Sequence, residues 1–196
     1  MKIELHDHET APDGSKATLA AVNEANGFIP NLFRALGNSP STLNGFVALV
    51  QANDGGTLSP AERQIVQLTA SMENRAGYCI AGHSAFATRI GMPIEMITAI
   101  RESRPLPDRR HQALVDFTRA LVRSRGHVTD DEKEAFEAAG FGTDQVLEII
   151  AGIALKTVTN FVSSSLDLPL DPQFQPYART TDSDQVVAPE YDAMAS

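Results

Sequence analysis

Apolar residues recur along most of this chain at spacings of three and four, which is the pattern of amphipathic helices. Helix starts are marked as well, most clearly at Ser59 and Pro60, where a serine N-cap and a first-turn proline precede Glu62. The absence of β-branched runs with a period of two predicts an all-α fold. The predicted helices cover residues 15–26, 30–36, 40–54, 60–74, 77–90, 93–102, 108–124, 129–140 and 144–166.

The predicted helix over 144–166 is the most apolar segment of the chain. Its apolar residues, among them Ile149, Val158 and Phe161, lie on more than one helical face. A helix with this pattern is either central to the fold or buried at a subunit interface.

Composition divides the chain into three regions. We predict an N-terminal helical part over 1–57, which packs on a helical core over 58–166, and an acidic tail over 167–196. From residue 171 onward the tail has three prolines, and its five acidic residues against one arginine carry −4 of the net charge of −9. We expect this tail to be extended or disordered, or ordered only by wrapping a neighbouring subunit.

The charge balance argues against one class of partner. The 196 residues include 16 Lys and Arg against 25 Asp and Glu, whereas nucleic-acid binding depends mainly on basic groups that neutralise phosphates. We therefore expect no nucleic-acid partner. No run approaches the roughly 18 consecutive apolar residues of a membrane span, and the first residues are polar. We expect a cytoplasmic protein with no membrane partner.

Cys79 is the single cysteine, so no internal disulfide can form. It lies in the first turn of the predicted helix over 77–90, and His83 follows one turn later on the same face. The positive end of the helix dipole and the imidazole both favour a thiolate. Two interpretations stay open on spacing alone: a reactive thiol with a histidine partner, or a small buried residue beside a hydrogen-bonded core histidine.

Over residues 27–166 the chain resembles a known family. The resemblance rests on Gly27-Phe-Ile-Pro-Asn-Leu-Phe-Arg-Ala-Leu36, Leu58-Ser-Pro-Ala-Glu-Arg-Gln64, Tyr78-Cys79 with His83, and Gly140-Phe-Gly142 in this order. With these motifs the chain is similar to the alkylhydroperoxidase D (AhpD) and carboxymuconolactone decarboxylase superfamily, particularly its peroxidase-related branch. The resemblance implies an all-α multi-helix bundle. Together with the apolar helix over 144–166, it implies a homo-oligomer.

The peroxidase form of that family has a glutamate, a Cys-x-x-Cys pair and a histidine four residues after the second cysteine. By resemblance, Cys79 is the cysteine that attacks the peroxide and His83 relays protons. Two positions depart from the pattern, because Ala76 stands in place of the resolving cysteine and Gln64 in place of the glutamate. A sulfenic acid at Cys79 must then be reduced by an external thiol, and an amide cannot exchange a proton as a carboxylate can.

These departures leave three functional hypotheses. The leading one is a peroxidase-related, antioxidant oxidoreductase with peroxiredoxin activity, which reduces hydroperoxides through Cys79 with an external thiol. In it His83 accepts the proton, while Gln64 and Tyr78 supply hydrogen bonds around the reacting atoms. One alternative is a decarboxylase-like enzyme that uses His83 as acid or base on a small carboxylated lactone. The other is a catalytically inactive oligomeric scaffold that binds a small molecule or a protein.

Other polar residues are weaker candidates for the site. Glu62 and Glu73 are the nearest carboxylates in sequence, but Glu62 fits a capping box and Glu73 the outer side of its helix. Arg75 favours the thiolate only if it points inward. The His-Asp-His-Glu run at 6–9 lies near the terminus, so we expect no metal site, and no cofactor.

Overall fold

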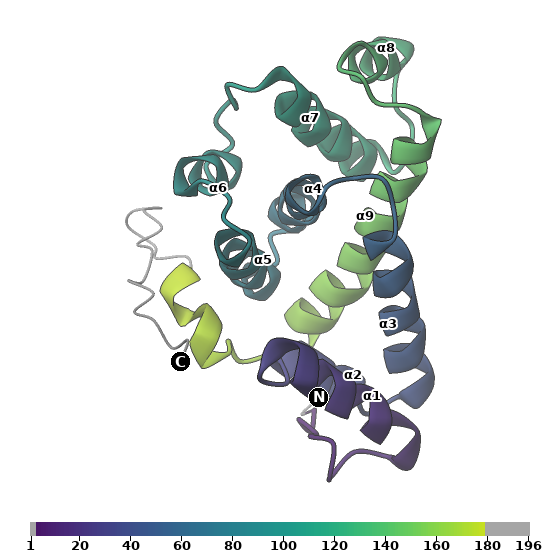
Figure 1. Cartoon of the computed structure of the whole chain (residues 1–196), viewed down its shortest axis with the longest axis vertical. Coiled ribbons are helices and arrows are strands. Elements are labelled where there is room, and N and C mark those ends of the chain that lie inside the picture. Colours follow the sequence, from purple (N-terminus) through teal and green to yellow (C-terminus); the bar gives the residue numbers. More distant parts are fainter. Residues whose placement is uncertain (1–2, 179–196) are drawn as a thin grey trace.

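The structure of the protein, a computed structural model, describes residues 3–178. Over this range it is all-helical without strands, as predicted, and each expected helix is present with its ends displaced by at most two residues. Figure 1 shows the arrangement. The elements are α1 (Asp13–Asn26), α2 (Asn31–Leu36), α3 (Pro40–Asp54), α4 (Pro60–Glu73), α5 (Gly77–Arg89), α6 (Ile94–Arg101), α7 (Arg109–Ser124), α8 (Asp130–Ala138), α9 (Thr143–Ser165) and the 3-10 helix η1 (Pro172–Tyr177).

Reciprocal side-chain caps fix two of the helix starts. The Ser59 hydroxyl accepts a hydrogen bond from the Glu62 N–H, and the Glu62 carboxylate accepts one from the Ser59 N–H. Thr129 and Glu132 form the same pair at the start of α8. Such caps satisfy N–H groups that have no partner inside the helix, which explains why the sequence marks α4 and α8 so clearly.

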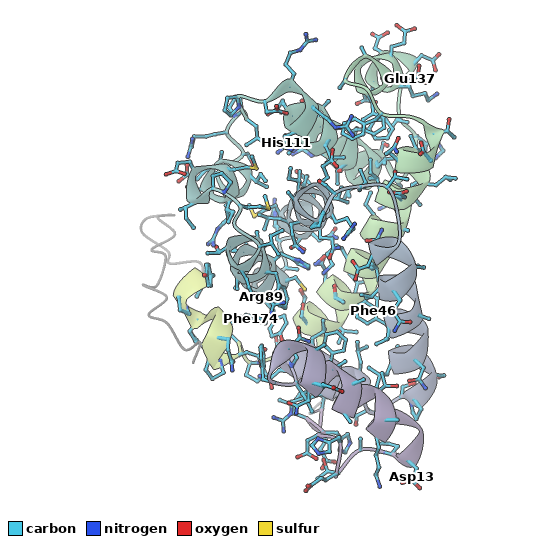
Figure 2. All side chains as sticks on the ribbon, viewed as in Figure 1. Asp13, Phe46, Arg89, His111, Glu137 and Phe174 are labelled. Atoms are coloured by element: carbon cyan, nitrogen blue, oxygen red, sulfur yellow. The ribbon has the colours of Figure 1, made fainter. Side chains whose placement is uncertain are left out.

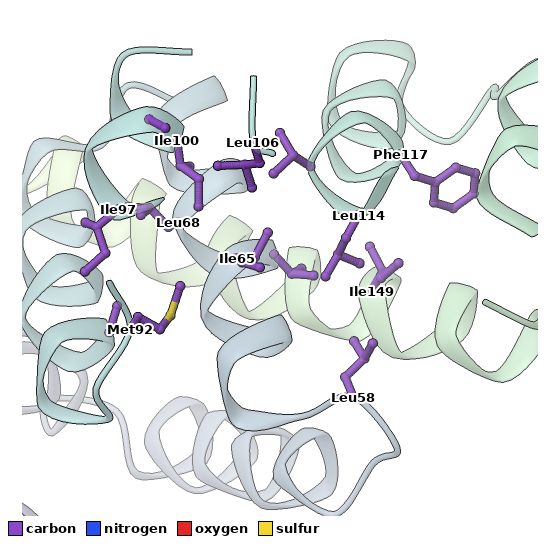
Figure 3. Packing of buried hydrophobic residues seen from close by; sticks show 14 of the residues in the cluster. Leu58, Ile65, Leu68, Met92, Ile97, Ile100, Leu106, Leu114, Phe117 and Ile149 are labelled. Atoms are coloured by element: carbon purple, nitrogen blue, oxygen red, sulfur yellow. The ribbon is translucent and has the colours of Figure 1, made fainter. Parts of the chain in front are cut away.

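The main apolar core surrounds α4. This helix packs against α5, α6, α7 and α9, which enclose it in Figure 1. Its residues Ile65 and Leu68 have no exposed surface. Figure 3 shows Ile65 among side chains of neighbouring helices, including Leu114 of α7 and Ile149 of α9. This packing fixes the positions of α5 and α9 relative to α4.

A second apolar cluster joins α9 to the N-terminal helices. Leu155 of α9 packs there with Leu19 of α1 and Leu43 of α3, and Figure 2 places Phe46 of α3 toward α9. Since α9 also contacts α4 and α5, it packs on more than one face. This agrees with one of the two positions that its apolar pattern allowed, the centre of the fold.

The sequence predicted no membrane span because no run of consecutive apolar residues is long enough. By length and composition alone, however, α9 could cross a membrane. Its most apolar window has a mean hydropathy of 1.5. The same helix carries Lys156, Asn160 and Ser163, which are buried and make polar contacts with α4 and α5. Leu147 and Phe161, in contrast, are 64% and 62% exposed. We interpret α9 as the central helix of a packed fold, with part of its apolar surface uncovered.

The beginning of the expected tail is ordered, which corrects the prediction of an extended or disordered segment for residues 172–177. There η1 packs on α5 of the same chain, and Phe174 is 3% exposed. Its ring meets those of Phe28, Tyr78 and Phe86 edge-on, and Figure 2 shows it beside α5. These aromatic residues bury enough apolar surface to order the segment, although its charge and proline content had predicted disorder. The remaining tail, 179–196, lies outside the described residues.

Candidate functional site

Cys79 and His83 lie one turn apart on α5, as the sequence predicts, in the region where α4, α5 and α9 pack together. Cys79 is a free thiol that is 3% exposed, and His83 is 9% exposed. A tight turn after α4 sets the start of α5, with the exposed Arg75 at a φ of 54°. The fold therefore places the thiol inside the molecule, near the end of α4.

Both ring nitrogens of His83 have partners. Nδ1 lies 2.9 Å from Oε1 of Gln64, and Nε2 lies within hydrogen-bond distance of Nζ of Lys156. Because an amide oxygen only accepts, Nδ1 carries the proton and Nε2 presents its lone pair to the lysine amine. Side chains from α4, α5 and α9 thus form one chain of hydrogen bonds with a single consistent direction.

Lys156 is the member of this cluster that the sequence analysis missed. It is 3% exposed. Burial lowers the pKa of its amine, while the charge of Cys79 acts in the opposite direction. The signal that could have revealed it is a lone basic residue in the most apolar helix, since a buried charge needs a specific partner.

The surroundings keep the imidazole of His83 neutral. Burial lowers its pKa well below the ordinary 6.5, and the charge of Lys156 lowers it further. The residue that the resemblance identifies as a proton relay therefore has both nitrogens engaged and a weak tendency to take up a proton.

The sulfur of Cys79 has a polar neighbour on α9. Its Sγ lies 3.7 Å from Oγ of Ser163. Ser163 donates to the carbonyl of Asn160 over 3.2 Å, so its hydroxyl oxygen is free to accept from the thiol. The Asn160 amide donates in turn to the hydroxyl of Ser71 on α4 over 3.2 Å. Cys79 is thus part of a polar seam between helices, which an inert core cysteine does not require.

Tyr78 does not take part in the cluster around Cys79. Its hydroxyl donates to Oδ2 of Asp171 over 2.5 Å and accepts from the Leu32 N–H over 3.1 Å. Burial and the neighbouring Asp171 both raise the pKa of Tyr78. The sequence predicted that Tyr78 donates a hydrogen bond to the reacting atoms. In the structure its hydroxyl donates instead to Asp171, just before η1.

The two positions that depart from the family pattern have clear places in the structure. Ala76 has no exposed surface and is the N-cap residue of α5, so a methyl group fills the place of the resolving cysteine. Gln64 does stand beside His83, where the resemblance implies the glutamate. The amide keeps the hydrogen bond but supplies no negative charge.

Neither nearby carboxylate replaces the missing one. Glu62 pairs with Arg110 over 2.8 Å, and Glu73 pairs with Arg119 and Arg123 over 3.0 and 2.7 Å. Both are therefore engaged outside the cluster.

The Cys79 cluster is enclosed by protein. A cleft of about 330 Å³ lies elsewhere, between α7 and α8, and neither Cys79 nor His83 lines it. The thiol therefore does not open into this cleft. Within residues 3–178, no group of three or more His, Cys, Asp or Glu is placed to hold a metal ion.

Residues 40–105 match the carboxymuconolactone decarboxylase family. This segment contains Gln64, Cys79 and His83, and it begins before residue 58, where the sequence places the start of the core. The chain has no significant match among the curated proteins.

Several solved structures share the fold. An uncharacterized peroxidase-related protein from Silicibacter sp. TM1040 is 21% identical, with a TM-score of 0.77 over 89% of this chain and 92% of that one. A peroxidase-related protein with an alkylhydroperoxidase AhpD core, from Ralstonia eutropha JMP134, is 21% identical, with a TM-score of 0.79 over 88% and 93%. A cysteine-to-alanine variant of the debrominase Bmp8, in complex with 2,3,4-tribromopyrrole, is 18% identical, with a TM-score of 0.77 over 89% and 94%.

Proposed function

We propose that this chain, which matches the carboxymuconolactone decarboxylase family over residues 40–105 and shares its fold with peroxidase-related proteins of the alkylhydroperoxidase D type, belongs to that superfamily and reduces hydroperoxides through Cys79 with an external thiol. The observation that carries the proposal is the placement of the single cysteine in a polar seam. Ser163 lies at its sulfur, and the His83–Lys156 pair lies one turn away along α5. These neighbours can stabilise a thiolate, which is the reactive form of cysteine.

The reaction has two stages. The thiolate of Cys79 attacks the terminal oxygen of ROOH, which forms a sulfenic acid and releases an alkoxide that takes up a proton to give ROH. Because Ala76 supplies no second sulfur, an external thiol R′SH then displaces water from the sulfenic acid and leaves a mixed disulfide. A second R′SH releases R′SSR′ and restores the Cys79 thiol. We propose a cytoplasmic location, where small thiols are abundant and reduced.

Trapping the sulfenic acid tests this proposal directly. Folded protein treated with tert-butyl hydroperoxide and dimedone should carry a dimedone adduct on the Cys79 peptide, and Cys79→Ser should carry none. With excess dithiothreitol, the wild type should consume the hydroperoxide and the variant should not. Folded wild-type protein that forms no adduct and consumes no hydroperoxide would contradict the proposal.

Bmp8 motivates a second candidate substrate class. The debrominase shares the fold, and its cysteine-to-alanine variant was solved with 2,3,4-tribromopyrrole. By analogy, a proton adds to the ring carbon that carries bromine, and the Cys79 thiolate removes the bromine as Br⁺, which gives the debrominated ring and a sulfenyl bromide at Cys79. One external thiol then displaces bromide to form a mixed disulfide, and a second releases the external disulfide and restores the Cys79 thiol. Thiol-dependent release of bromide from 2,3,4-tribromopyrrole by the wild type, but not by Cys79→Ser, would support this substrate class.

We do not favour the lactone decarboxylase. That reaction needs an acid or base, and both nitrogens of His83 are already engaged in hydrogen bonds. Activity on a carboxylated lactone that survives Cys79→Ser would restore this alternative. If folded protein has neither activity, the inactive scaffold is the remaining hypothesis.

For assembly, we propose that a second copy of this chain covers the outer face of α9. Leu147 and Phe161 lie on that face and are strongly exposed. Apolar patches of this kind on the outside of a helix commonly mark a protein–protein interface. Light scattering should give an oligomeric mass for the wild type and a monomeric mass for the double variant Leu147→Glu/Phe161→Glu. A monomeric wild type would contradict the proposal.

A further inference from the structure

We propose that Lys156 is the proton partner of Cys79, and that His83 and Gln64 are positioning residues that hold the lysine amine in place. This assignment deepens the proposed function and rests on it. It differs from the role that the family resemblance gives to His83, because in this chain a lysine occupies the acceptor nitrogen of the imidazole.

Two contacts set the register between α5 and α9. Cys79 contacts Ser163, and His83 contacts Lys156. Along α5 the histidine follows the cysteine, whereas along α9 the lysine precedes the serine, so the two helices run in opposite directions at this seam. Lys156 therefore lies on the side of α9 that faces the thiol, within reach of its charge.

His83 is poorly placed to take the thiol proton itself. Its Nδ1 proton is held by Gln64, and its Nε2 lone pair is directed at Nζ of Lys156. A proton that reached Nε2 would pass on to the neutral Lys156 amine beside it, because an amine is intrinsically more basic than an imidazole.

Lys156 has the complementary properties. Its amine is buried, so the charged form costs free energy unless an anion lies nearby. Among residues 3–178, the titratable groups that face it are Cys79 and His83, both on α5. Of these, only Cys79 becomes an anion. Transfer of the proton from the thiol to the amine would therefore create two charges that stabilise each other.

Acidic groups on the helices that pack against α9, and on α9 itself, are directed elsewhere. Glu148 of α9 accepts hydrogen bonds from the backbone N–H groups of Thr57 and Leu58. The other carboxylates of these helices that pair with arginines are Asp54 of α3, Glu62 and Glu73 of α4, and Asp116 of α7. In the part of the chain that the structure describes, Cys79 is thus the anion available to a charged Lys156.

The proton balance of the peroxide step follows from this pairing. The neutral Lys156 amine takes the Cys79 proton, which gives a thiolate and an ammonium. The thiolate then attacks ROOH, the O–O bond breaks, and sulfur is oxidised to the sulfenic acid while the peroxide is reduced. The departing alkoxide receives the proton from the ammonium, which yields ROH and returns Lys156 to its neutral form. No further oxidant or reductant enters this step.

A thiolate titration tests the assignment without any peroxide. Since Cys79 is the single cysteine, the ultraviolet absorbance of wild-type protein minus that of Cys79→Ser reports its ionisation as pH rises. Lys156→Met should move the midpoint of the titration upward by about one pH unit or more, because the thiolate loses its counter-ion. Lys133→Met removes the same charge from an exposed lysine on α8 and should leave the midpoint unchanged.

His83→Gln separates the two possible proton partners. If Lys156 is the partner, His83→Gln should move the midpoint less than Lys156→Met does. The assignment is overturned if Lys156→Met titrates like the wild type, or if His83→Gln gives the larger shift. Circular dichroism and thermal melts confirm that each variant is folded. Since the titration contains no substrate, an absence of peroxidase activity would contradict the proposed function while leaving this result interpretable.

Discussion

Nζ of Lys156 lies within hydrogen-bond distance of Nε2 of His83, inside the seam between α5 and α9. This contact joins the most apolar helix of the chain to the helix that carries Cys79 and His83. It also means that two basic groups with lowered pKa values share one buried site. Their neutral forms are the ones that fit the folded protein, which has consequences for stability as well as for reactivity.

Stability should therefore rise with pH across the range in which these two groups titrate. The pKa of His83 falls well below 6.5 and that of Lys156 falls below 10.5 on folding. Between each folded value and its ordinary value, the unfolded chain binds a proton that the folded chain does not. The free energy of unfolding then decreases as pH falls, by about 1.4 kcal/mol per pH unit for each group in its own window.

Replacing Lys156 by methionine isolates its contribution. Lys156→Met should be more stable than the wild type at neutral pH by about 1–4 kcal/mol, since an apolar side chain replaces a buried amine. The gain should shrink as pH rises toward 10.5, where the wild-type lysine is neutral in both states and only the lost hydrogen bond to His83 remains. Urea unfolding at several pH values measures this difference. A constant difference between neutral and alkaline pH would contradict the lowered pKa of Lys156.

Restoring the family's carboxylate should change the protonation of His83. In Gln64→Glu, a carboxylate would lie at the distance of 2.9 Å from Nδ1 that the amide oxygen now has. The negative charge favours the imidazolium, so the pKa of His83 should rise by about one unit or more, against the opposing charge of Lys156. NMR titration of the histidine ring protons measures the shift, with His83→Gln used for assignment.

Gln67→Glu provides the matched control for that substitution. Gln67 lies three residues after Gln64 on α4, so the substitution adds the same charge to this helix. Its side chain is not part of the hydrogen-bonded chain formed by Gln64, His83 and Lys156. An equal shift of His83 in both variants would show a general charge effect rather than a specific contact through Nδ1.

The sequence was sufficient for the helices and for the placement of Cys79 and His83 one turn apart on α5, because both follow from local periodicity. It was also sufficient to place Gln64, but only through the order of motifs in the resemblance. Lys156 could not be placed in the same way. Its partner His83 is on another helix, and the register between α5 and α9 depends on core packing that no local pattern encodes.

The destination of Tyr78 was missed for the same reason. Tyr78 is adjacent to Cys79 in sequence, but successive helical positions are rotated by about 100°. The Tyr78 side chain therefore points to a different side of α5. Its partner Asp171 lies far away in sequence, in a segment whose charge and prolines suggested disorder. Long-range polar contacts of this kind are visible only once the helices are placed.

Installing a second thiol should convert the proposed cycle to a two-cysteine cycle. Ala76 is three residues before Cys79 and is fully buried. In Ala76→Cys, hydroperoxide should produce an internal disulfide, so the dimedone adduct on Cys79 should fall about tenfold while the intact mass drops by two hydrogens. The larger side chain should also cost about 1–3 kcal/mol of stability.

Ala76→Ser is the control for that variant, since it adds a polar atom of similar reach without a thiol. It should keep the full dimedone adduct. If Ala76→Cys forms no disulfide and keeps its adduct, the position is not aligned with Cys79 for attack, and the correspondence with the family's Cys-x-x-Cys pair is wrong at Ala76.

Removing the Tyr78 hydroxyl should weaken the attachment of η1 while sparing the chemistry of Cys79. The hydroxyl donates to Asp171, which also accepts from the Asn31 N–H over 3.0 Å. Tyr78→Phe should lower the free energy of unfolding by about 1–3 kcal/mol, because a buried carboxylate loses a donor. Burial already raises the pKa of Asp171, and the hydrogen bond from Tyr78 opposes that rise.

The loss in Tyr78→Phe should therefore depend on pH. A carboxyl group whose folded pKa is raised stabilises the protein below its ordinary pKa, and this contribution is lost as pH rises through the folded value. Without the Tyr78 donor the folded pKa of Asp171 is higher still, so the deficit should be larger at pH 7 than near 3.8. Tyr177→Phe, in the same aromatic cluster, serves as the control. If Tyr78→Phe instead leaves stability unchanged and slows sulfenic acid formation in folded protein, then Tyr78 acts at the reacting atoms as the sequence first indicated.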